Sequence, residues 1–172
     1  KFAPWGMGDL RRAARRSYQL KANWKLVVQN YSECIHCPIA HPLLNKQSHY
    51  MSGDNEPPRP TYLGGRMDLR EGMKTLSLDG QTSREPLPGL SAEDRRRIYY
   101  YALLPNLLLN LHPDYMLTFQ IWPLAVDRTE VVAAEEVLFV AVSGEEEDRD
   151  EAGSRAAANQ LGGFDAVHFG HS

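Results

Sequence analysis

The sequence pattern that most constrains the fold is a series of strand-forming segments, separated by short turns, in the second half of the chain. Residues 98–111 and 115–123 are apolar and rich in aromatic side chains, and a His-Pro-Asp tripeptide separates them. Proline and aspartate favour tight turns, so these segments predict two central antiparallel strands. Residues 129–142 carry β-branched side chains near both ends, which predicts a further strand of the same sheet.

Other segments supply the remaining elements. Residues 62–69, 74–78 and 81–84 have strand-like composition, and an Asp-Gly pair between the last two is a hairpin signal. Residues 143–160 begin with acidic side chains, which suit the positive end of a helix dipole, and they predict a long helix. The length fits one domain, residues 1–172. This order of elements predicts an α+β fold with an antiparallel sheet.

The N-terminal region predicts two helices. Residues 9–16 form the first, and its arginine-rich stripe is a solvated face or a docking surface for an acidic partner. Residues 18–25 alternate as a short strand does, and the second helix then covers residues 26–41. Pro42 should end this helix, because the residue before a proline is disfavoured in the α conformation. Residues 43–61 follow as an irregular loop, which is typical of a lid, an access loop or a disordered segment.

The composition excludes several classes of protein. A formal net charge of −3 offers no broad basic surface for nucleic acid. No apolar run reaches the roughly 18 residues that a membrane span requires, and the first residues are not a secretory signal. Because the two cysteines are only three residues apart, a disulfide between them would not close a long loop, so a disulfide-stabilised scaffold is not expected. This cysteine content favours the reducing environment of the cytoplasm. The chain does not begin with methionine, so we expect a fragment of a longer protein.

Groups that can hold a metal or move a proton are concentrated in residues 30–42. This segment contains two histidines, two cysteines, one glutamate and one asparagine. His36 and His41 are five residues apart, so a regular helix would place them roughly 140° apart around its axis. Pro38 lies between them and removes a helical hydrogen bond, so a bend there can bring both imidazoles to one side.

The cysteine pair is compatible with several kinds of site. A redox CxxC normally opens a helix after a buried strand, and a structural zinc site needs four ligands. Haem attachment requires a histidine where Pro38 stands, and a Rieske cluster requires a second Cys/His pair. The favoured interpretation is that Cys34 and Cys37 are two buried apolar thiols. A zinc site built from both cysteines and both histidines is a weaker alternative, because these four residues are too closely spaced for a relaxed tetrahedron.

The segment resembles the iron-binding helix of the Rieske non-haem iron oxygenases of the aromatic-ring-hydroxylating dioxygenase type. In that family the helix belongs to the catalytic domain of the large (alpha) subunit. The residues that match the family pattern are Asn23, Trp24, Lys25, Asn30, Tyr31, Glu33, His36 and His41. Gln29 departs from the pattern, which has an acidic residue at that position. Asn23 is also a plausible N-cap for the helix that follows it. Weaker similarity covers residues 104–115 and 121–123.

The resemblance implies a mononuclear Fe(II) site in a helix-grip fold, in which an antiparallel sheet wraps around a long C-terminal helix. His36 and His41 would bind the iron, and Asn30 would lie near its open face. Glu33 would link the iron to a Rieske [2Fe-2S] cluster, which a missing domain or the neighbouring subunit of a homo-oligomer, such as a trimer, supplies. A reductase or ferredoxin would deliver electrons to that cluster.

The resemblance also implies a third iron ligand, an aspartate far downstream on the long helix. Asp165 is the best candidate, because it lies late in the chain in a mixed apolar context. Asp148 and Asp150 belong to an acidic run and are better explained as a solvated helix start. His49 and His112 are expected to be packed or surface residues, although His112 can face the cavity from a strand end. Alternatively, the true ligand is missing from the chain near its C-terminus.

Two functions follow from these observations. The first is O₂-dependent hydroxylation or demethylation of a small organic substrate, such as an aromatic hydrocarbon, by a mono- or dioxygenase that is inactive without its Rieske electron donor. The alternative is a non-catalytic helix-grip module that binds a ligand and has a degenerate metal site. The third carboxylate distinguishes the two. Met67, Leu76, Leu107 and Phe119 predict an apolar lining for the cavity.

Overall fold

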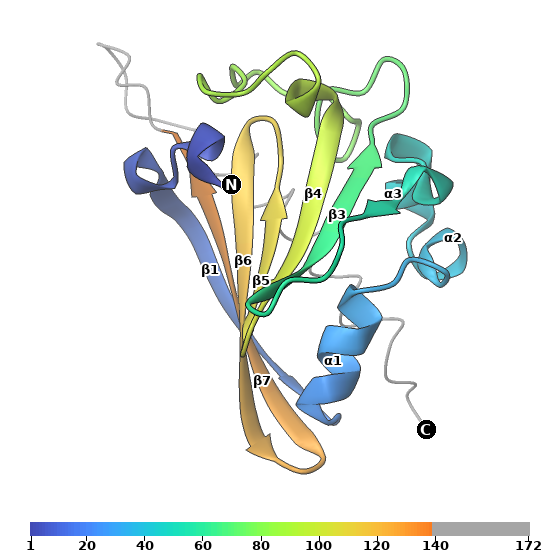
Figure 1. Cartoon of the computed structure of the whole chain (residues 1–172), viewed down its shortest axis with the longest axis vertical. Coiled ribbons are helices and arrows are strands. Elements are labelled where there is room, and N and C mark those ends of the chain that lie inside the picture. Colours follow the sequence, from blue (N-terminus) through green and yellow to red (C-terminus); the bar gives the residue numbers. More distant parts are fainter. Residues whose placement is uncertain (139–172) are drawn as a thin grey trace.

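The computed structural model describes residues 1–138, which form a curved seven-stranded antiparallel sheet and three short α-helices (Figure 1). Across the sheet the strand order is β1-β7-β6-β5-β4-β3-β2. The strands are β1 (Arg11–Leu20), β2 (Asp54–Asn55), β3 (Tyr62–Asp68), β4 (Arg97–Leu103), β5 (Leu107–Leu111), β6 (Tyr115–Ala125) and β7 (Arg128–Val137). The α-helices are α1 (Trp24–Tyr31), α2 (Cys37–Ala40) and α3 (Pro42–Gln47), and the 3-10 helices are η1 (Ala3–Trp5), η2 (Met7–Asp9), η3 (Tyr50–Ser52) and η4 (Asp94–Arg96).

The centre of the sheet agrees with the sequence prediction. β5 and β6 are antiparallel neighbours joined by the His-Pro-Asp turn, and β6 pairs with β7 through the turn that follows Ala125. β7 begins at Arg128, as its β-branched start predicts. The predicted end of this strand at residues 139–142 and the predicted helix at 143–160 lie outside the described residues.

The prediction of a single strand at residues 98–111 is wrong, because this segment forms two strands, β4 and β5. A turn containing Pro105 and Asn106 reverses the chain between them. Pro105 has no N–H to contribute to a strand ladder, and the Asn106 side chain instead donates to the Ile121 carbonyl at 3.2 Å. The two short strands therefore pair with each other as a hairpin.

The helix predicted at residues 9–16 is also wrong, because most of this segment belongs to the edge strand β1. β1 pairs antiparallel with β7 along its length, and Ser17 Oγ donates to a carboxylate oxygen of Glu130 on β7 at 2.5 Å. Pairing with a strand more than 100 residues away satisfies the backbone of β1, and local propensity does not report such a contact. The short strand predicted at 18–25 accordingly ends at Leu20.

The strands predicted at residues 74–78 and 81–84 are replaced by turns of the loop between β3 and β4. Gly80 of the Asp-Gly pair does turn the chain, with a φ of 75°, and its carbonyl accepts a backbone N–H at 2.8 Å. The loop is held by Leu76 and Leu87, which are 3% and 2% exposed. Burial of these two side chains fixes the loop on the sheet without adding strands to it.

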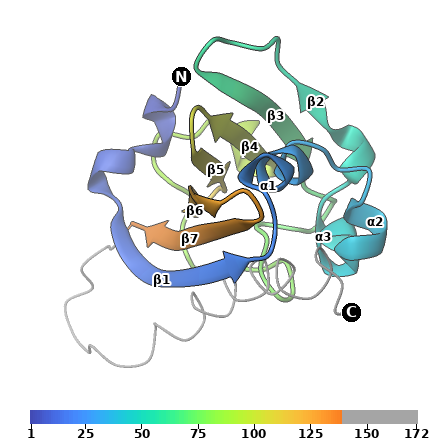
Figure 2. The same ribbon diagram turned by 90° about the horizontal axis from the view of Figure 1, so that it is seen from below.

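α1 lies on the concave side of the sheet, where it covers one part of the core, and α2 and α3 lie farther along the chain beside it (Figure 2). Asn23 caps α1 as predicted, since its side chain accepts the Lys25 N–H at 3.0 Å. Val27 of α1 is 1% exposed and belongs to a cluster that includes Leu117 and Phe119 of β6. This packing places the C-terminal end of α1, and the polar segment that follows it, at the sheet.

The sheet agrees with the antiparallel part of the predicted helix-grip fold. The long helix predicted for this fold lies outside the described residues. Among the helices that residues 1–138 form, none is both long enough and apolar enough to cross a lipid bilayer.

Candidate functional site

The two candidate histidines flank α2, in a segment that is divided into short helices. α1 ends at Tyr31, a turn covers residues 32–36, and α2 is only one turn long before α3 begins at Pro42. Pro38 and Pro42 each stand in the first turn of a new helix, where a missing N–H costs no hydrogen bond. The continuous helix predicted up to residue 41 is therefore wrong, and the break falls where the prolines are.

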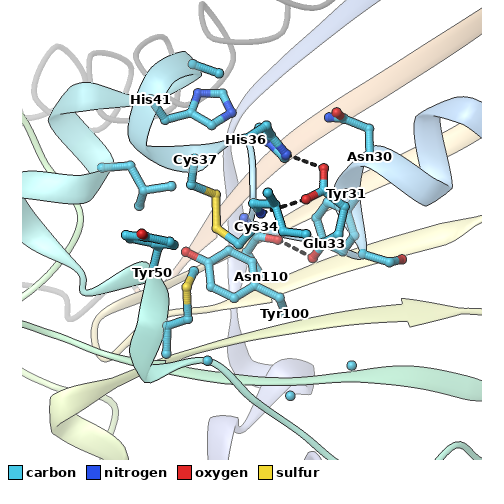
Figure 3. A pocket seen from close by; sticks show the side chains of 18 of the residues that line it. Asn30, Tyr31, Glu33, Cys34, His36, Cys37, His41, Tyr50, Tyr100 and Asn110 are labelled. Carbon is cyan, nitrogen blue, oxygen red and sulfur yellow. Dashed lines mark hydrogen bonds and ion pairs between the residues drawn. A yellow bond between two sulfur atoms is a disulfide. The ribbon is translucent and has the colours of Figure 1, made fainter.

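This break brings the imidazoles of His36 and His41 together (Figure 3). Their ring centres lie 5.2 Å apart, and the ring planes are inclined by 73°. Metal ions take imidazole nitrogens at about 2.0–2.2 Å, so two rings at this separation can both reach one ion. The bend near Pro38 has the predicted effect on the geometry, while the role of the rings as ligands stays a prediction.

Glu33 orients the His36 ring (Figure 3). Glu33 Oε1 lies 2.5 Å from His36 Nδ1, and Glu33 Oε2 accepts the Ile35 backbone N–H at 2.6 Å. Partial burial acts to raise the pKa of the Glu33 carboxyl, but these hydrogen bonds outweigh it and the pKa is lowered. A carboxylate held on Nδ1 fixes the imidazole tautomer and leaves Nε2 as the nitrogen that can bind a metal.

The cysteines are not the two thiols that the sequence predicts. Cys34 and Cys37 form a disulfide, with Cα atoms 5.0 Å apart. The turn before α2 brings their Cα atoms into the range that a disulfide requires. Cys37 is buried as predicted, at 4% exposure. The alternative zinc site built from both cysteines and both histidines does not fit this state, because a disulfide offers no thiolate.

The histidines border a cavity of about 670 Å³ that extends from the helices to β3, β4 and β5. Met67, Leu76 and Phe119 line it as predicted, whereas Leu107 does not. Besides the histidines, the side chains that give the lining its chemical character are Asn30, Tyr31, Glu33, Tyr50, Arg66, Tyr100, Asn110 and Phe119. A cavity of this size, mostly apolar with a few polar groups, suits a small organic ligand.

Three further residues in this lining were not predicted from the sequence. The single hydroxyl hydrogen of Tyr31 is shared between two acceptors, the Leu109 carbonyl at 2.9 Å and the side-chain oxygen of Asn110. The Tyr100 hydroxyl is buried and has no hydrogen-bond partner within residues 1–138, and burial raises the pKa of Tyr100 well above its usual range. Asn110, a polar residue within the apolar segment 107–111, is the sequence signal that could have indicated this wall of the cavity.

The remaining predicted site residues have different positions. Asn30 lines the cavity beside Glu33 (Figure 3), whereas Asp165 lies outside the described residues. His49 is exposed, and its Nδ1 accepts the Met51 N–H at 3.2 Å. Within residues 1–138, no group of three histidine, cysteine, aspartate or glutamate side chains can hold a metal ion. The described part of the chain therefore supplies two candidate ligands and no candidate for the third.

His112 is a packing residue. It is fully buried and stacks on Tyr115, with ring centres 3.9 Å apart, and it does not line the cavity. Burial, with a smaller contribution from the positive charge of Arg84, lowers the pKa of His112 to about 3. The imidazole is therefore neutral at physiological pH, and its prediction as a packed residue is confirmed.

A second buried polar cluster lies near His112. Arg84 reaches Glu135 Oε1 at 3.3 Å and Asp114 Oδ2 at 3.8 Å, and both acidic side chains are at most 2% exposed. Burial raises the pKa of both carboxyls, although Arg84 opposes this effect. One arginine thus compensates two buried acidic groups.

The chain matches the family model described as "Ring hydroxylating alpha subunit (catalytic domain)" over residues 7–165. One relative is the glycine betaine monooxygenase oxygenase subunit of Chromohalobacter salexigens, which is 28% identical over 76% of this chain and 36% of its own length. Another is the carnitine monooxygenase oxygenase subunit of Escherichia coli (strain K12), 56% identical over 34 residues, or 20% of this chain and 9% of that protein. The chain thus spans little more than a third of the first of these relatives.

Solved structures share the fold. A quaternary ammonium Rieske monooxygenase, whose structure concerns carnitine oxidation by gut microbiota, aligns with a TM-score of 0.65 and 20% identity over 96% of this chain and 39% of that one. Naphthalene 1,2-dioxygenase from Rhodococcus sp. aligns with a TM-score of 0.56 and 14% identity over 88% and 39% of the two chains. At these identities the likeness concerns the fold alone, and it is the sequence match that decides the family. The chain belongs to the family of ring-hydroxylating alpha subunits, within their catalytic domain.

Proposed function

We propose that this catalytic domain holds Fe(II) between His36, His41 and a carboxylate, and that it oxidises a small quaternary ammonium compound with O₂. The observation that carries the proposal is the pair of adjacent imidazoles at the edge of a cavity, one of them oriented by Glu33. Two imidazoles and one carboxylate form the donor set typical of non-haem Fe(II) oxygenases. Asp165 is our candidate for the carboxylate.

The donor set fits Fe(II) and offers no thiolate for a sulfur-ligated zinc site. The neutral Nε2 of His36 is available because Nδ1 is engaged by Glu33, and the disulfide removes the thiolates that zinc prefers. When bound, the iron would supply the O₂ activation that the side chains themselves cannot perform. The protein residues orient the ligand rings, provide a shielded space for substrate and hold a proton acceptor next to His36.

Glu33 is suited to connect the site with an electron donor. One carboxylate oxygen contacts His36, while 39% of the Glu33 side chain remains exposed to solvent. We infer that this exposed side faces a Rieske [2Fe-2S] domain, from another segment or a neighbouring subunit of a homo-oligomer, which a reductase or ferredoxin reduces. A carboxylate between two metal centres can relay a proton while it fixes the ligand it touches.

The substrate class rests on the relatives and on the cavity lining. Two relatives are named for glycine betaine and carnitine, which favours a quaternary ammonium substrate over the aromatic hydrocarbon suggested by the family resemblance. Tyr31, Tyr50, Tyr100 and Phe119 offer aromatic faces, which attract methylated ammonium groups. The buried Tyr100 hydroxyl can donate to an oxygen of a zwitterionic substrate.

A second candidate function is a ligand-binding module without catalysis. It is favoured by one observation, namely that residues 1–138 contain no complete three-ligand group. In that case the cavity would bind an organic cation, and Fe(II) would not bind tightly.

Anaerobic Fe(II) titration tests the proposal. We expect tight binding of one Fe(II) by the chain and its loss in the double variant His36→Ala, His41→Ala. Asp165→Ala should weaken binding strongly, while Asp148→Ala and Asp150→Ala serve as matched controls with wild-type affinity. Binding that survives the histidine double variant would refute the iron site, whereas binding that survives Asp165→Ala alone would refute only the choice of third ligand.

A further inference from the structure

The disulfide lies within the proposed iron-binding segment. Cys34 belongs to the turn after α1, and Cys37 is the first residue of α2. Their bond closes a loop of four residues that contains His36, so a proposed ligand projects from inside the loop. Figure 3 shows the disulfide next to the imidazole pair. Any change in this bond therefore acts directly on the segment that positions His36.

Both sulfur-bearing residues are part of the cavity wall. Cys37 is almost fully buried, whereas Cys34 is partly exposed. A small reagent that enters the cavity can therefore reach the Cys34 side of the bond first. Accessible cysteines of this kind are the ones that exchange and oxidise, in contrast with inert buried thiols.

We propose that Cys34 and Cys37 are a reversible dithiol–disulfide site that controls which metal His36 and His41 bind. The metal-binding part of this inference rests on the proposed function of the two histidines. Because nothing else in the proposed catalytic role uses the cysteines, their position around His36 is otherwise unexplained.

The chemistry balances with two ordinary reagents. In reduction, a thiolate of a dithiol attacks the Cys34 sulfur and releases Cys37 as a thiolate, which takes up a proton. The second thiol of the reagent then displaces Cys34, so the reagent leaves as its own disulfide and both cysteines become thiols. In oxidation, hydrogen peroxide accepts two electrons from the two thiols and leaves as two molecules of water.

The backbone can tolerate both states. The Cys37 N–H donates to the Cys34 carbonyl at 3.2 Å, and the His41 N–H donates to the Cys37 carbonyl at 2.9 Å. These backbone bonds do not involve the sulfur atoms, so they can persist when the disulfide is reduced. The change is local: the loop around His36 loses its covalent closure, and two thiols are added beside two imidazoles.

The two states should differ in metal preference. The oxidised state has imidazoles and a carboxylate as donors, which suit Fe(II), and its closed loop holds His36 in place. The reduced state adds two soft sulfur donors, which favour Zn(II) over Fe(II). We therefore expect reduction to weaken Fe(II) binding by about tenfold, a typical effect of losing a group that orients a ligand, and to strengthen Zn(II) binding by at least as much.

The thiol state can be measured without any assay of activity. The chain contains two cysteines, and trypsin releases both in one peptide, residues 26–46, because Lys25 and Lys46 flank it. Mass spectrometry after iodoacetamide should find both cysteines unmodified in the isolated chain, both modified after treatment with a dithiol, and both protected again after hydrogen peroxide. Modification of both cysteines without any reductant would overturn the inference.

The metal preference is tested by anaerobic titration of Fe(II) and Zn(II) into each state, after removal of the reagents. The double variant Cys34→Ser, Cys37→Ser separates loop closure from sulfur ligation: it should show the weaker Fe(II) binding but not the stronger Zn(II) binding. Equal affinities in the two states, with Fe(II) bound tightly in both, would overturn this inference alone. Absence of Fe(II) binding in both states would overturn the proposed function and, with it, the metal half of the inference.

Discussion

The Nδ1 atom of His36 lies 2.5 Å from Oε1 of Glu33, and the other oxygen of the same carboxylate accepts the Ile35 N–H. Glu33 is therefore fixed at both oxygens while part of its side chain stays in contact with solvent. This relationship gives the carboxylate two separable tasks, which are to orient the ring of a metal ligand and to carry charge at the surface.

Two substitutions at Glu33 should separate these tasks. Glu33→Ala removes the acceptor for His36 Nδ1, so we expect Fe(II) affinity to fall by about 10- to 100-fold. Glu33→Gln keeps an acceptor oxygen but removes the charge, so it should retain most of the Fe(II) affinity while turnover with the electron donor falls sharply. Fe(II) titration and turnover measured on the same samples provide the comparison. Wild-type affinity in Glu33→Ala would show that this contact does not orient the ligand.

The Tyr100 hydroxyl should bind substrate rather than support the fold. Because this buried hydroxyl has no partner within residues 1–138, Tyr100→Phe should leave thermal stability unchanged or raise it slightly. The same variant should weaken binding of glycine betaine or carnitine by about tenfold, since it loses a hydrogen bond to a charged acceptor. Calorimetric titration of both compounds measures this effect.

The neighbouring Tyr99→Phe is the matched control for Tyr100→Phe. Tyr99 donates to Asp94 at 2.7 Å and does not line the cavity, so its loss should lower stability and leave ligand affinity intact. The assignment of Tyr100 fails if both variants bind the ligand equally well.

His112 should make the fold sensitive to acid. Its pKa is about 3 in the folded chain and about 6.5 in an unfolded one, so the unfolded state binds more protons between these values. The effect of His112 on the free energy of unfolding should therefore be smallest above pH 6.5. As the pH decreases from 6.5 toward 3, the free energy of unfolding should fall by up to about 1.4 kcal/mol per pH unit. Asp114 and Glu135, whose pKa values are raised, act in the opposite direction, since their contribution is lost as the pH rises.

The variant His112→Phe isolates this contribution, because phenylalanine can keep the stacking on Tyr115 without a titrating group. The free energy of unfolding of both proteins can be measured with urea from pH 3.5 to 7.5. As the pH is lowered, we expect the unaltered protein to lose more stability than the variant. A difference that is constant across this range would contradict the role given to His112.

Arg84 should be required to keep two acidic groups buried. Arg84→Met leaves Asp114 and Glu135 without their positive partner. We expect the free energy of unfolding to fall by about 1–3 kcal/mol. This is less than for a fully buried pair, because 30% of the Arg84 side chain is exposed. Adding Glu135→Gln should recover part of this loss, since one buried charge is then removed. Additive losses in the double variant would argue against a coupled cluster.

The sequence predicted the elements whose signals are local. The β5–β6 turn follows from its proline and aspartate, the α1 cap from Asn23, and the approach of His36 to His41 from the proline between them. In each case the decisive groups lie within a few residues of one another. Their geometry is therefore fixed by the local chain.

The features that sequence did not predict depend on distant contacts. β1 carries helix-forming arginines, but its pairing with β7 decides its conformation. The Tyr31–Asn110 contact joins residues 79 positions apart, and the sequence around each residue does not predict that the two meet. The disulfide depends on the residue at which α2 begins, because a helix that starts at Cys37 brings the two sulfur atoms together.

The measurement that tests the central claim most directly is X-ray absorption at the iron edge of the chain loaded anaerobically with Fe(II). We predict a nearest shell made only of nitrogen and oxygen at about 2.0–2.2 Å, with the signature of two imidazoles, and loss of that signature in the variant His36→Ala, His41→Ala. A spectrum with sulfur ligands at about 2.3 Å, or one with no imidazole signature in the unaltered chain, would contradict the proposed iron site.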